Sequence, residues 1–132
     1  GTLLIFALDR NEALAVPPLR DFSIPEPPTS ELDVKTITKG NTPYHEHCAL
    51  CHRGLGQLSI VATAVPDLRR MSEETHQQFA AIVLGGSKKD LGMPSFVDTL
   101  DNQSSEAIRT FVISKALEAR AQQEKKTEPT RG

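Results

Sequence analysis

Two cysteines and a histidine lie close together in the stretch Cys48-Ala49-Leu50-Cys51-His52. They are the only two cysteines of the chain, so no other thiol competes for either of them. At this spacing each thiol can bond one vinyl-derived carbon on the same edge of a porphyrin, and the following histidine can reach the iron from one face. The pattern predicts a covalently attached c-type haem, around which a small chain would fold.

The iron of such a haem takes axial ligands, and the sequence offers a candidate for each side. His52 is the expected proximal ligand, because imidazole nitrogen suits iron and a side chain beside the attachment points cannot drift away. Met93 lies in the non-helical turn Gly92-Met93-Pro94, from which a loop can present a thioether to the iron. Met71, the other methionine, precedes a helix start and is expected to pack on that helix. Ligation by His52 and Met93 predicts an electron carrier of positive reduction potential.

Three alternatives stay open on the sequence alone. A zinc site would need two more ligands; His45 and His47 are near, but their spacing matches no familiar zinc motif. A redox dithiol would need a surrounding strand-helix-strand pattern, which is missing. A haem with an open sixth position would bind a small gas or peroxide, as a sensor or an enzyme. Under the main interpretation, His45, His47 and His76 are expected to be solvated.

Composition argues against several classes of function. The chain has 132 residues and a formal net charge of -2, whereas nucleic-acid binding requires a basic surface that neutralises phosphates. The apolar run Leu3–Leu8 is too short to span a bilayer and lacks the basic lead-in of a signal peptide. Because the chain begins at Gly1 and such haems are attached outside the bacterial cytoplasm, we expect a processed or excised product that has lost an export signal. The expected location is the periplasm.

Helical patterns dominate the second half of the chain. We expect a mainly α-helical domain over residues 33–120, preceded by residues 1–32 and followed by a disordered tail over residues 121–132. The clearest helix runs from about residue 103 to residue 123. Its apolar residues recur at helical spacing: Ile108, Phe111, Val112 and Ala116.

The N-terminal segment combines a strand pattern with a proline-rich stretch. Residues 2–8 are apolar and typical of a β-strand that ends in a turn. Residues 16–28 contain five prolines, which block a regular helix and favour an extended linker. This linker is either disordered or lies along a surface through Leu19, Phe22 and Ile24.

Two further helices are expected within the domain. Asp33 is a suitable N-cap for the first, and Pro43 should either kink that helix or mark a new start with Thr42 as the N-cap. Ser72 and the acidic residues after it open the second, which ends at Gly85-Gly86. The apolar face of this second helix is formed by Phe79, Ile82 and Val83.

A wider set of residues accompanies the cysteine motif between residues 34 and 116. It comprises Gly40, Tyr44, Pro66-Asp67-Leu68, Gly92-Met93-Pro94 and Phe111. This set resembles the class I cytochrome c family, in which the first and last helices cross closely at a glycine and two aromatic residues. The resemblance gives these roles to Gly40, Tyr44 and Phe111. It also implies that the carbonyl of Pro66 accepts the free N–H of the proximal histidine, which would orient the imidazole ring. Pro43 departs from the family's uninterrupted first helix.

The order of segments carries a second resemblance. Residues 1–9 form an apolar strand pattern, a proline-rich segment follows, and the cytochrome part contains Pro66-Asp67-Leu68-Arg69. This order resembles the C-terminal part of quinohaemoprotein alcohol dehydrogenases, in which a propeller that holds pyrroloquinoline quinone (PQQ) carries a tethered cytochrome c domain. Alternatively, residues 1–9 form an ordinary strand that packs on the cytochrome itself.

This second resemblance implies a role without substrate chemistry. The chain itself would bind no PQQ. It would accept single electrons from a PQQ-dependent dehydrogenase domain or subunit and pass them to a periplasmic or membrane acceptor.

Arg53, Arg69 and Arg70 would either pair with haem propionates or remain solvated. The turn Lys88-Lys89-Asp90 would either steer a redox partner or remain solvated.

Overall fold

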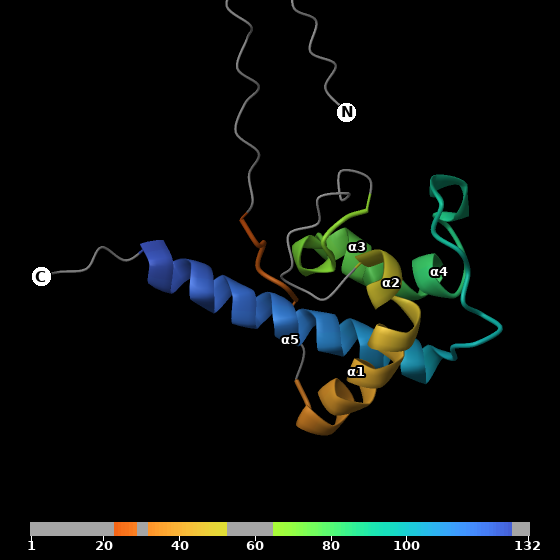
Figure 1. Ribbon diagram of the computed structural model, residues 1–132, viewed down its shortest axis with the longest axis horizontal. Coiled ribbons are helices and arrows are strands. Elements are labelled where there is room, and N and C mark those ends of the chain that lie inside the picture. Colours follow the sequence, from red (N-terminus) through yellow and green to blue (C-terminus); the bar gives the residue numbers. More distant parts are fainter. Residues whose placement is uncertain (1–22, 29–31, 53–64, 128–132) are drawn as a thin grey trace, which may run out of the picture.

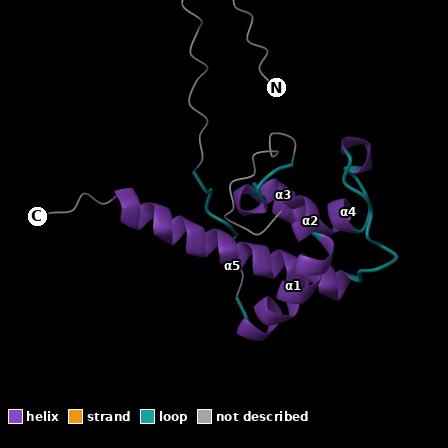
Figure 2. Cartoon of the chain, viewed as in Figure 1, coloured by secondary structure: helices purple, strands orange, loops and turns teal. Residues whose placement is uncertain are grey.

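The computed structural model describes residues 23–28, 32–52 and 65–127 (Figure 1). Within these ranges every regular element is a helix, as Figure 2 shows, which confirms the mainly α-helical class. No helix in the described ranges has the length and apolar character needed to cross a membrane. The strand expected over residues 2–8 lies outside the described residues.

The first helix, α1 (Val34–His47), begins where the sequence predicts and continues through Pro43. Asp33 is its N-cap: a side-chain oxygen of Asp33 accepts a hydrogen bond from the backbone N–H of Thr36, at 3.1 Å. The expected new start with Thr42 as N-cap is wrong. Proline lacks the N–H of one helical hydrogen bond, but the residues on either side of it, Gly40 and Tyr44, are buried and hold α1 together through tertiary packing.

The last helix, α5 (Asn102–Thr127), crosses α1 at very short range (Figure 1). A Cβ atom added to Gly40 would lie 1.9 Å from the carbonyl oxygen of Ala107, so only glycine fits at this crossing. The rings of Tyr44 and Phe111 pack beside it, with centroids 5.2 Å apart. The close crossing at a glycine and two aromatic residues, as implied by the resemblance to class I cytochrome c, is therefore present.

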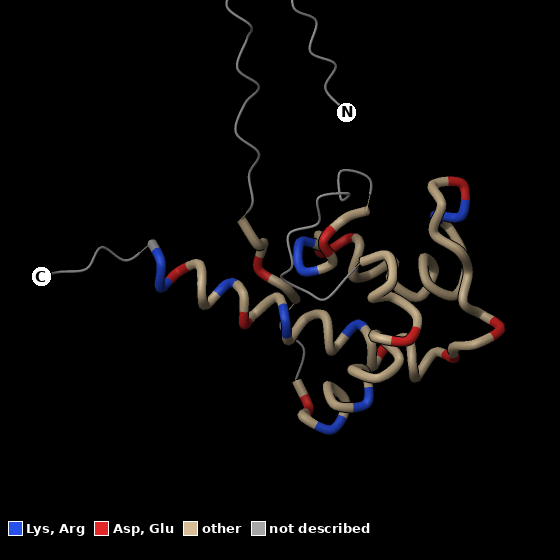
Figure 3. The backbone as a smooth tube through the Cα atoms, in the orientation of Figure 1, with Lys and Arg blue, Asp and Glu red and all other residues tan. Residues whose placement is uncertain are grey.

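Helix α5 is longer than the sequence predicts. It continues to Thr127, past the expected end at residue 123, so the disordered tail expected from residue 121 is wrong for residues 121–127. Acidic and basic residues follow one another along this part of the chain, as the red and blue segments of the tube show (Figure 3). Arg120 Nε, for example, donates a hydrogen bond to Glu124 at 3.1 Å, and pairs of this spacing support a helix beyond its packed face.

The described end of the proline-rich stretch, residues 23–28, lies against α5. Ile24 and Pro27 are buried. The backbone N–H of Ile24 donates to Gln123 at 3.2 Å, and Glu26 lies 3.4 Å from Arg120. A linker that follows a surface is therefore the correct alternative for these residues, and the expected domain start at residue 33 leaves out chain that packs on the domain.

The helix expected after Ser72 is divided into two short helices, α3 (Glu73–Gln77) and α4 (Phe79–Val83). Ser72 caps α3 as predicted, accepting the backbone N–H of Thr75 at 3.2 Å. The division falls at Gln78, where φ is -89° and ψ is 4°, outside the α-helical region. The expected apolar face of α4 is buried, and the chain turns away at Gly86, where φ is +68°.

Candidate functional site

A single helical turn brings the two cysteines and the histidine of the motif together. Cys48 ends α1, and the short helix α2 (Ala49–His52) follows it directly. The carbonyl of Cys48 accepts hydrogen bonds from the backbone N–H groups of Cys51, at 3.2 Å, and His52, at 2.9 Å. Cys48 is buried and Cys51 is exposed. Burial, with a smaller contribution from Cys51, raises the pKa of the Cys48 thiol to about 11.

The imidazole of His52 is held by the residue that the family resemblance names. Its Nδ1 donates a hydrogen bond to the carbonyl oxygen of Pro66, at 3.0 Å. Because a carbonyl oxygen can only accept, Nδ1 carries a proton, and in the neutral imidazole the lone pair is then on Nε2, where it can bind a metal. The structure thus contains the hydrogen bond expected between His52 and Pro66.

Met93 packs against the apolar core to which Cys48 of the motif belongs. It is partly buried against this cluster of buried side chains. Met71 is buried within that cluster, as expected for a residue that packs on the following helix. The structure therefore places Met93, and not Met71, where its side chain is partly accessible. Its role as an axial ligand stays a prediction.

Two other predicted site residues have roles within the protein itself. Tyr44 is fully buried at the crossing of α1 and α5, and this burial raises the pKa of its hydroxyl. Arg69 forms a fork with Asp67, in which Nη2 lies 2.6 Å from one carboxylate oxygen. Burial raises the pKa of Asp67, but the hydrogen bonds from Arg69 outweigh it and hold this pKa below its usual value. Pairing of Arg69 with a haem propionate stays a prediction, and Arg53 lies outside the described residues.

The zinc alternative finds no support among the described residues. No three His, Cys, Asp or Glu side chains in the described ranges gather as a possible metal site. His45 is exposed as expected, with its Nδ1 2.9 Å from the carbonyl oxygen of Asn41. His47 is half-buried, and its ring lies 5.9 Å from that of Phe96.

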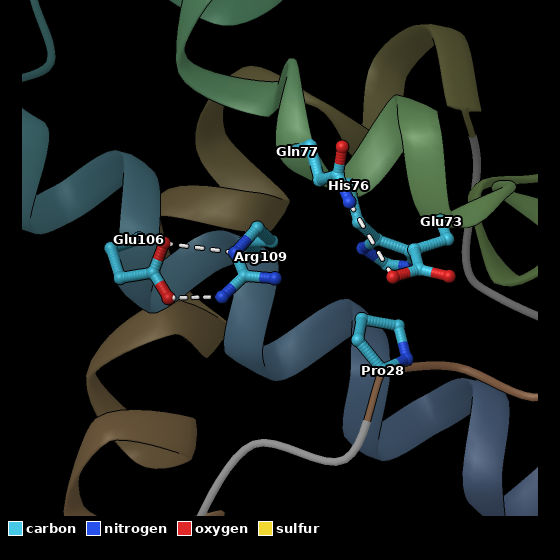
Figure 4. A pocket seen from close by; sticks show the side chains of 6 residues that line it. All are labelled: Pro28, Glu73, His76, Gln77, Glu106 and Arg109. Carbon is cyan, nitrogen blue, oxygen red and sulfur yellow. Dashed lines mark hydrogen bonds and ion pairs between the residues drawn. The ribbon is translucent and has the colours of Figure 1, made fainter.

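The expectation that His76 is solvated is wrong. Only 4% of its surface is exposed, because α3 places it against α5 beside Arg109 and Glu106. Burial lowers the pKa of His76, and the positive charge of Arg109 lowers it further. A pocket of about 300 Å³ lies at this contact. Figure 4 shows the side chains that line it. The other residues that line it are Pro28, Glu73 and Gln77.

The structure adds one polar residue that the sequence did not single out. The hydroxyl of Ser95 donates to the carbonyl oxygen of Leu84, at 2.5 Å, across the base of the loop that carries Met93. Nothing in the local sequence distinguishes this serine from others, because its partner is eleven residues away.

The donor set around the motif fits a c-type haem. It offers two thiols, an imidazole with a free Nε2 and a thioether at the edge of an apolar cluster. Large apolar side chains are exposed nearby in the sequence: Leu50 within the motif is 89% exposed, and Leu91 and Val97 on either side of Met93 are 81% and 62% exposed. Apolar surface of this kind suits a large apolar partner.

Comparison with known proteins decides the family. Residues 35–112 match the family model described as cytochrome C oxidase, cbb3-type, subunit III. The chain belongs to this family of cytochrome c domains. A domain of this kind implies haem c and suggests electron transfer.

The similar proteins are larger than this cytochrome c domain. Quinohemoprotein alcohol dehydrogenase ADH IIB of Pseudomonas putida is 38% identical over 119 residues, which are 88% of this chain and 16% of that protein. Quinohemoprotein alcohol dehydrogenase ADH-IIG of the same species is 35% identical over 92 residues, which are 70% of this chain and 12% of that protein. The cytochrome c domain thus spans less than a fifth of the length of these relatives.

A solved structure shows the same similarity in three dimensions. The structure of quinohemoprotein alcohol dehydrogenase ADHIIG from Pseudomonas putida HK5 superimposes with a TM-score of 0.68 at 29% identity. The superposition covers 83% of this cytochrome c domain and 16% of that chain. The resemblances to cytochrome c and to quinohaemoprotein alcohol dehydrogenases are confirmed.

Proposed function

We propose that this cytochrome c domain holds one haem c, attached through thioether bonds from Cys48 and Cys51, with His52 and Met93 as axial ligands. When bound, the haem supplies one-electron chemistry between ferrous and ferric iron. The hydrogen bond from His52 to the Pro66 carbonyl carries the proposal. It orients the imidazole, makes it a better ligand and leaves Nε2 as its only metal-binding atom.

The chain's own residues would hold the cofactor and shield it. Cys48 and Cys51 anchor it to the turn after α1, and the crossing of α1 on α5 at Gly40 fixes that turn in place. The apolar cluster that contains Cys48 excludes water on its side of the site. A thioether from Met93 would raise the reduction potential above that of a second imidazole.

The relatives support a place for this domain in an electron-transfer chain. Both are named quinohemoprotein alcohol dehydrogenases and are bacterial. We propose that this domain accepts single electrons from a PQQ-dependent dehydrogenase domain or subunit and passes them to a periplasmic or membrane acceptor. It would make and break no substrate bond itself. The periplasm is the proposed location, because haem is attached to such a motif outside the cytoplasm.

The choice between a six-coordinate carrier and an open-site sensor or enzyme depends on Met93. A matched pair of variants tests it in the haem-loaded protein, because Met93→Leu and Met71→Leu both conserve side-chain volume. We expect Met93→Leu to lose the weak sulfur-to-iron absorption band of the ferric state, to lower the reduction potential and to bind carbon monoxide faster in the ferrous state. Met71→Leu should leave all three unchanged, because Met71 is a core residue.

Two results would overturn the proposal. A Met93→Leu variant with the spectrum, potential and carbon monoxide reactivity of the unaltered protein would exclude Met93 as a ligand and favour the open-site alternative. Protein matured with haem that shows no Soret band and no reduced α and β bands would exclude haem altogether. The intact mass of the native gene product would report covalent haem and show whether a large dehydrogenase domain precedes residue 1.

A further inference from the structure

The loop that carries Met93 is closed at its base by two hydrogen bonds to the end of α4. The backbone N–H of Phe96 donates to the carbonyl of Val83, at 2.8 Å, and the hydroxyl of Ser95 donates to the carbonyl of Leu84, at 2.5 Å. The last carbonyl groups of a helix have no partner within the helix. The returning chain therefore completes α4 and is tied to it at the same time.

The Ser95 hydroxyl is placed by close packing as well as by hydrogen bonding. Gly86 has a φ of +68°, and a Cβ atom added to it would lie 3.0 Å from the Cβ of Ser95. The Ser95 oxygen also accepts the backbone N–H of Val97, at 3.4 Å. Ser95 thus links the start of the loop, at Leu84, to its end, at Val97.

Met93 lies between this closure and a second anchor at the tip of the loop. Its backbone N–H donates to the carbonyl of Lys88, at 3.3 Å, within the turn that contains the 3-10 helix η2 (Lys89–Leu91). Pro94 restricts its own φ and favours an extended conformation for Met93. The backbone of Met93 and Pro94, which leads from the thioether to Ser95, therefore has little conformational freedom.

We propose that Ser95 is a positioning residue for Met93, which holds the thioether at the haem iron by closing the loop on α4. This inference rests on the proposed function, because it assumes that Met93 is an axial ligand. Without the hydroxyl, the loop keeps the Phe96 bond and the tip anchor but opens more often, so the bond between Met93 sulfur and iron breaks more often.

The test compares Ser95→Ala with Thr99→Val in the haem-loaded full chain. Thr99 is the matched control, because its hydroxyl also donates to a backbone carbonyl, that of Phe96, at 3.2 Å, but outside the closed loop. Carbon monoxide replaces the methionine on ferrous iron in a ligand exchange without redox change, so its binding rate reports the open fraction. We expect Ser95→Ala to raise this rate about fivefold, as the loss of one neutral hydrogen bond allows, and Thr99→Val to leave it unchanged.

A second measurement reports the closure directly. In Ser95→Ala the backbone amide of Val97 should exchange its hydrogen faster, because its acceptor is gone. Gly86→Ala is a second variant, since its methyl group would lie 3.0 Å from the Cβ of Ser95 and alanine is strained at a φ of +68°. It should loosen the same closure and raise the carbon monoxide rate in the same direction. An equal loss of denaturation midpoint in Ser95→Ala and Thr99→Val, with no change of rate in either, would reduce Ser95 to a structural role and overturn the inference.

The inference and the proposed function fail in different ways. If Met93→Leu binds carbon monoxide at the rate of the unaltered protein, Met93 is not a ligand and the proposed function fails. If Met93→Leu binds it much faster while Ser95→Ala does not, Met93 is the ligand and the role of Ser95 alone is refuted.

Discussion

Replacement of Gly40 by alanine tests whether the crossing of α1 and α5 holds the domain together. The added methyl carbon would lie 1.9 Å from the carbonyl oxygen of Ala107 and 2.5 Å from its carbonyl carbon, both of them backbone atoms. Since such contacts are not observed below 3.0 Å, the two helices would have to separate by about 1 Å at this point, and dispersion contacts weaken steeply over such a distance.

The expected loss follows from two opposing effects. Alanine favours the helix over glycine by about 1 kcal/mol, which would stabilise the variant if there were space for the methyl group. Separation of the helices instead loosens the fully buried side chains of Tyr44, Ile108 and Val112. Overpacking of this kind usually costs 1–3 kcal/mol and more against rigid backbone, so we expect a net loss of about 3 kcal/mol.

The assay is thermal unfolding of the haem-loaded protein followed by far-ultraviolet circular dichroism. For a domain of this size, a loss of about 3 kcal/mol lowers Tm by roughly 15 °C. Asn41→Ala is the matched control, because residue 41 is exposed on the same helix and gains the same helix-favouring residue. A Gly40→Ala variant as stable as the Asn41→Ala control would refute the close crossing.

Two further predictions concern contacts that connect distant parts of the chain. The pKa of His76 is lowered by burial from its usual 6.5, so below about pH 6.5 the unfolded chain binds a proton that the folded chain does not, and stability must fall. His76→Gln should remove this part of the fall in the free energy of unfolding, measured by urea denaturation between pH 7 and pH 5. If the free energy of unfolding of His76→Gln fell with pH as steeply as that of the unaltered protein, the prediction would be contradicted. Ile24→Ala should lower the free energy of unfolding by about 2 kcal/mol, whereas Val34→Ala, at a 73% exposed position, should change it by less than about 0.5 kcal/mol. Equal effects at the two positions would show that residues 23–28 do not pack on α5 in solution.

Elements with local causes could be predicted from the sequence. Asp33 and Ser72 cap helices as predicted, because an N-cap bonds to a backbone N–H three residues away. The cysteine motif is equally local, since one helical turn holds it together. The hydrogen bond between His52 and Pro66 spans fourteen residues, and only resemblance to a known family predicted it.

The wrong predictions share a different physical origin. His76 is polar and sits among polar residues, so its sequence context indicates exposure, but α5 covers it. Pro43 locally disfavours a continuous helix, but packing of Gly40 and Tyr44 on α5 overrides that preference. The end of α5 depends in part on Ile24, whose backbone bonds to Gln123 from 99 residues away.

The sequence by itself determined the attachment motif, the candidate ligands, the helical class and the starts of α1 and α3, because these follow from chemistry at short spacing along the chain. The tertiary structure decided which side chains are buried, that Arg69 is engaged by Asp67, and that Ser95 closes the loop that carries Met93. Burial and loop closure depend on which distant segments come together, and the close approach at Gly40 sets that arrangement through packing that no local pattern encodes.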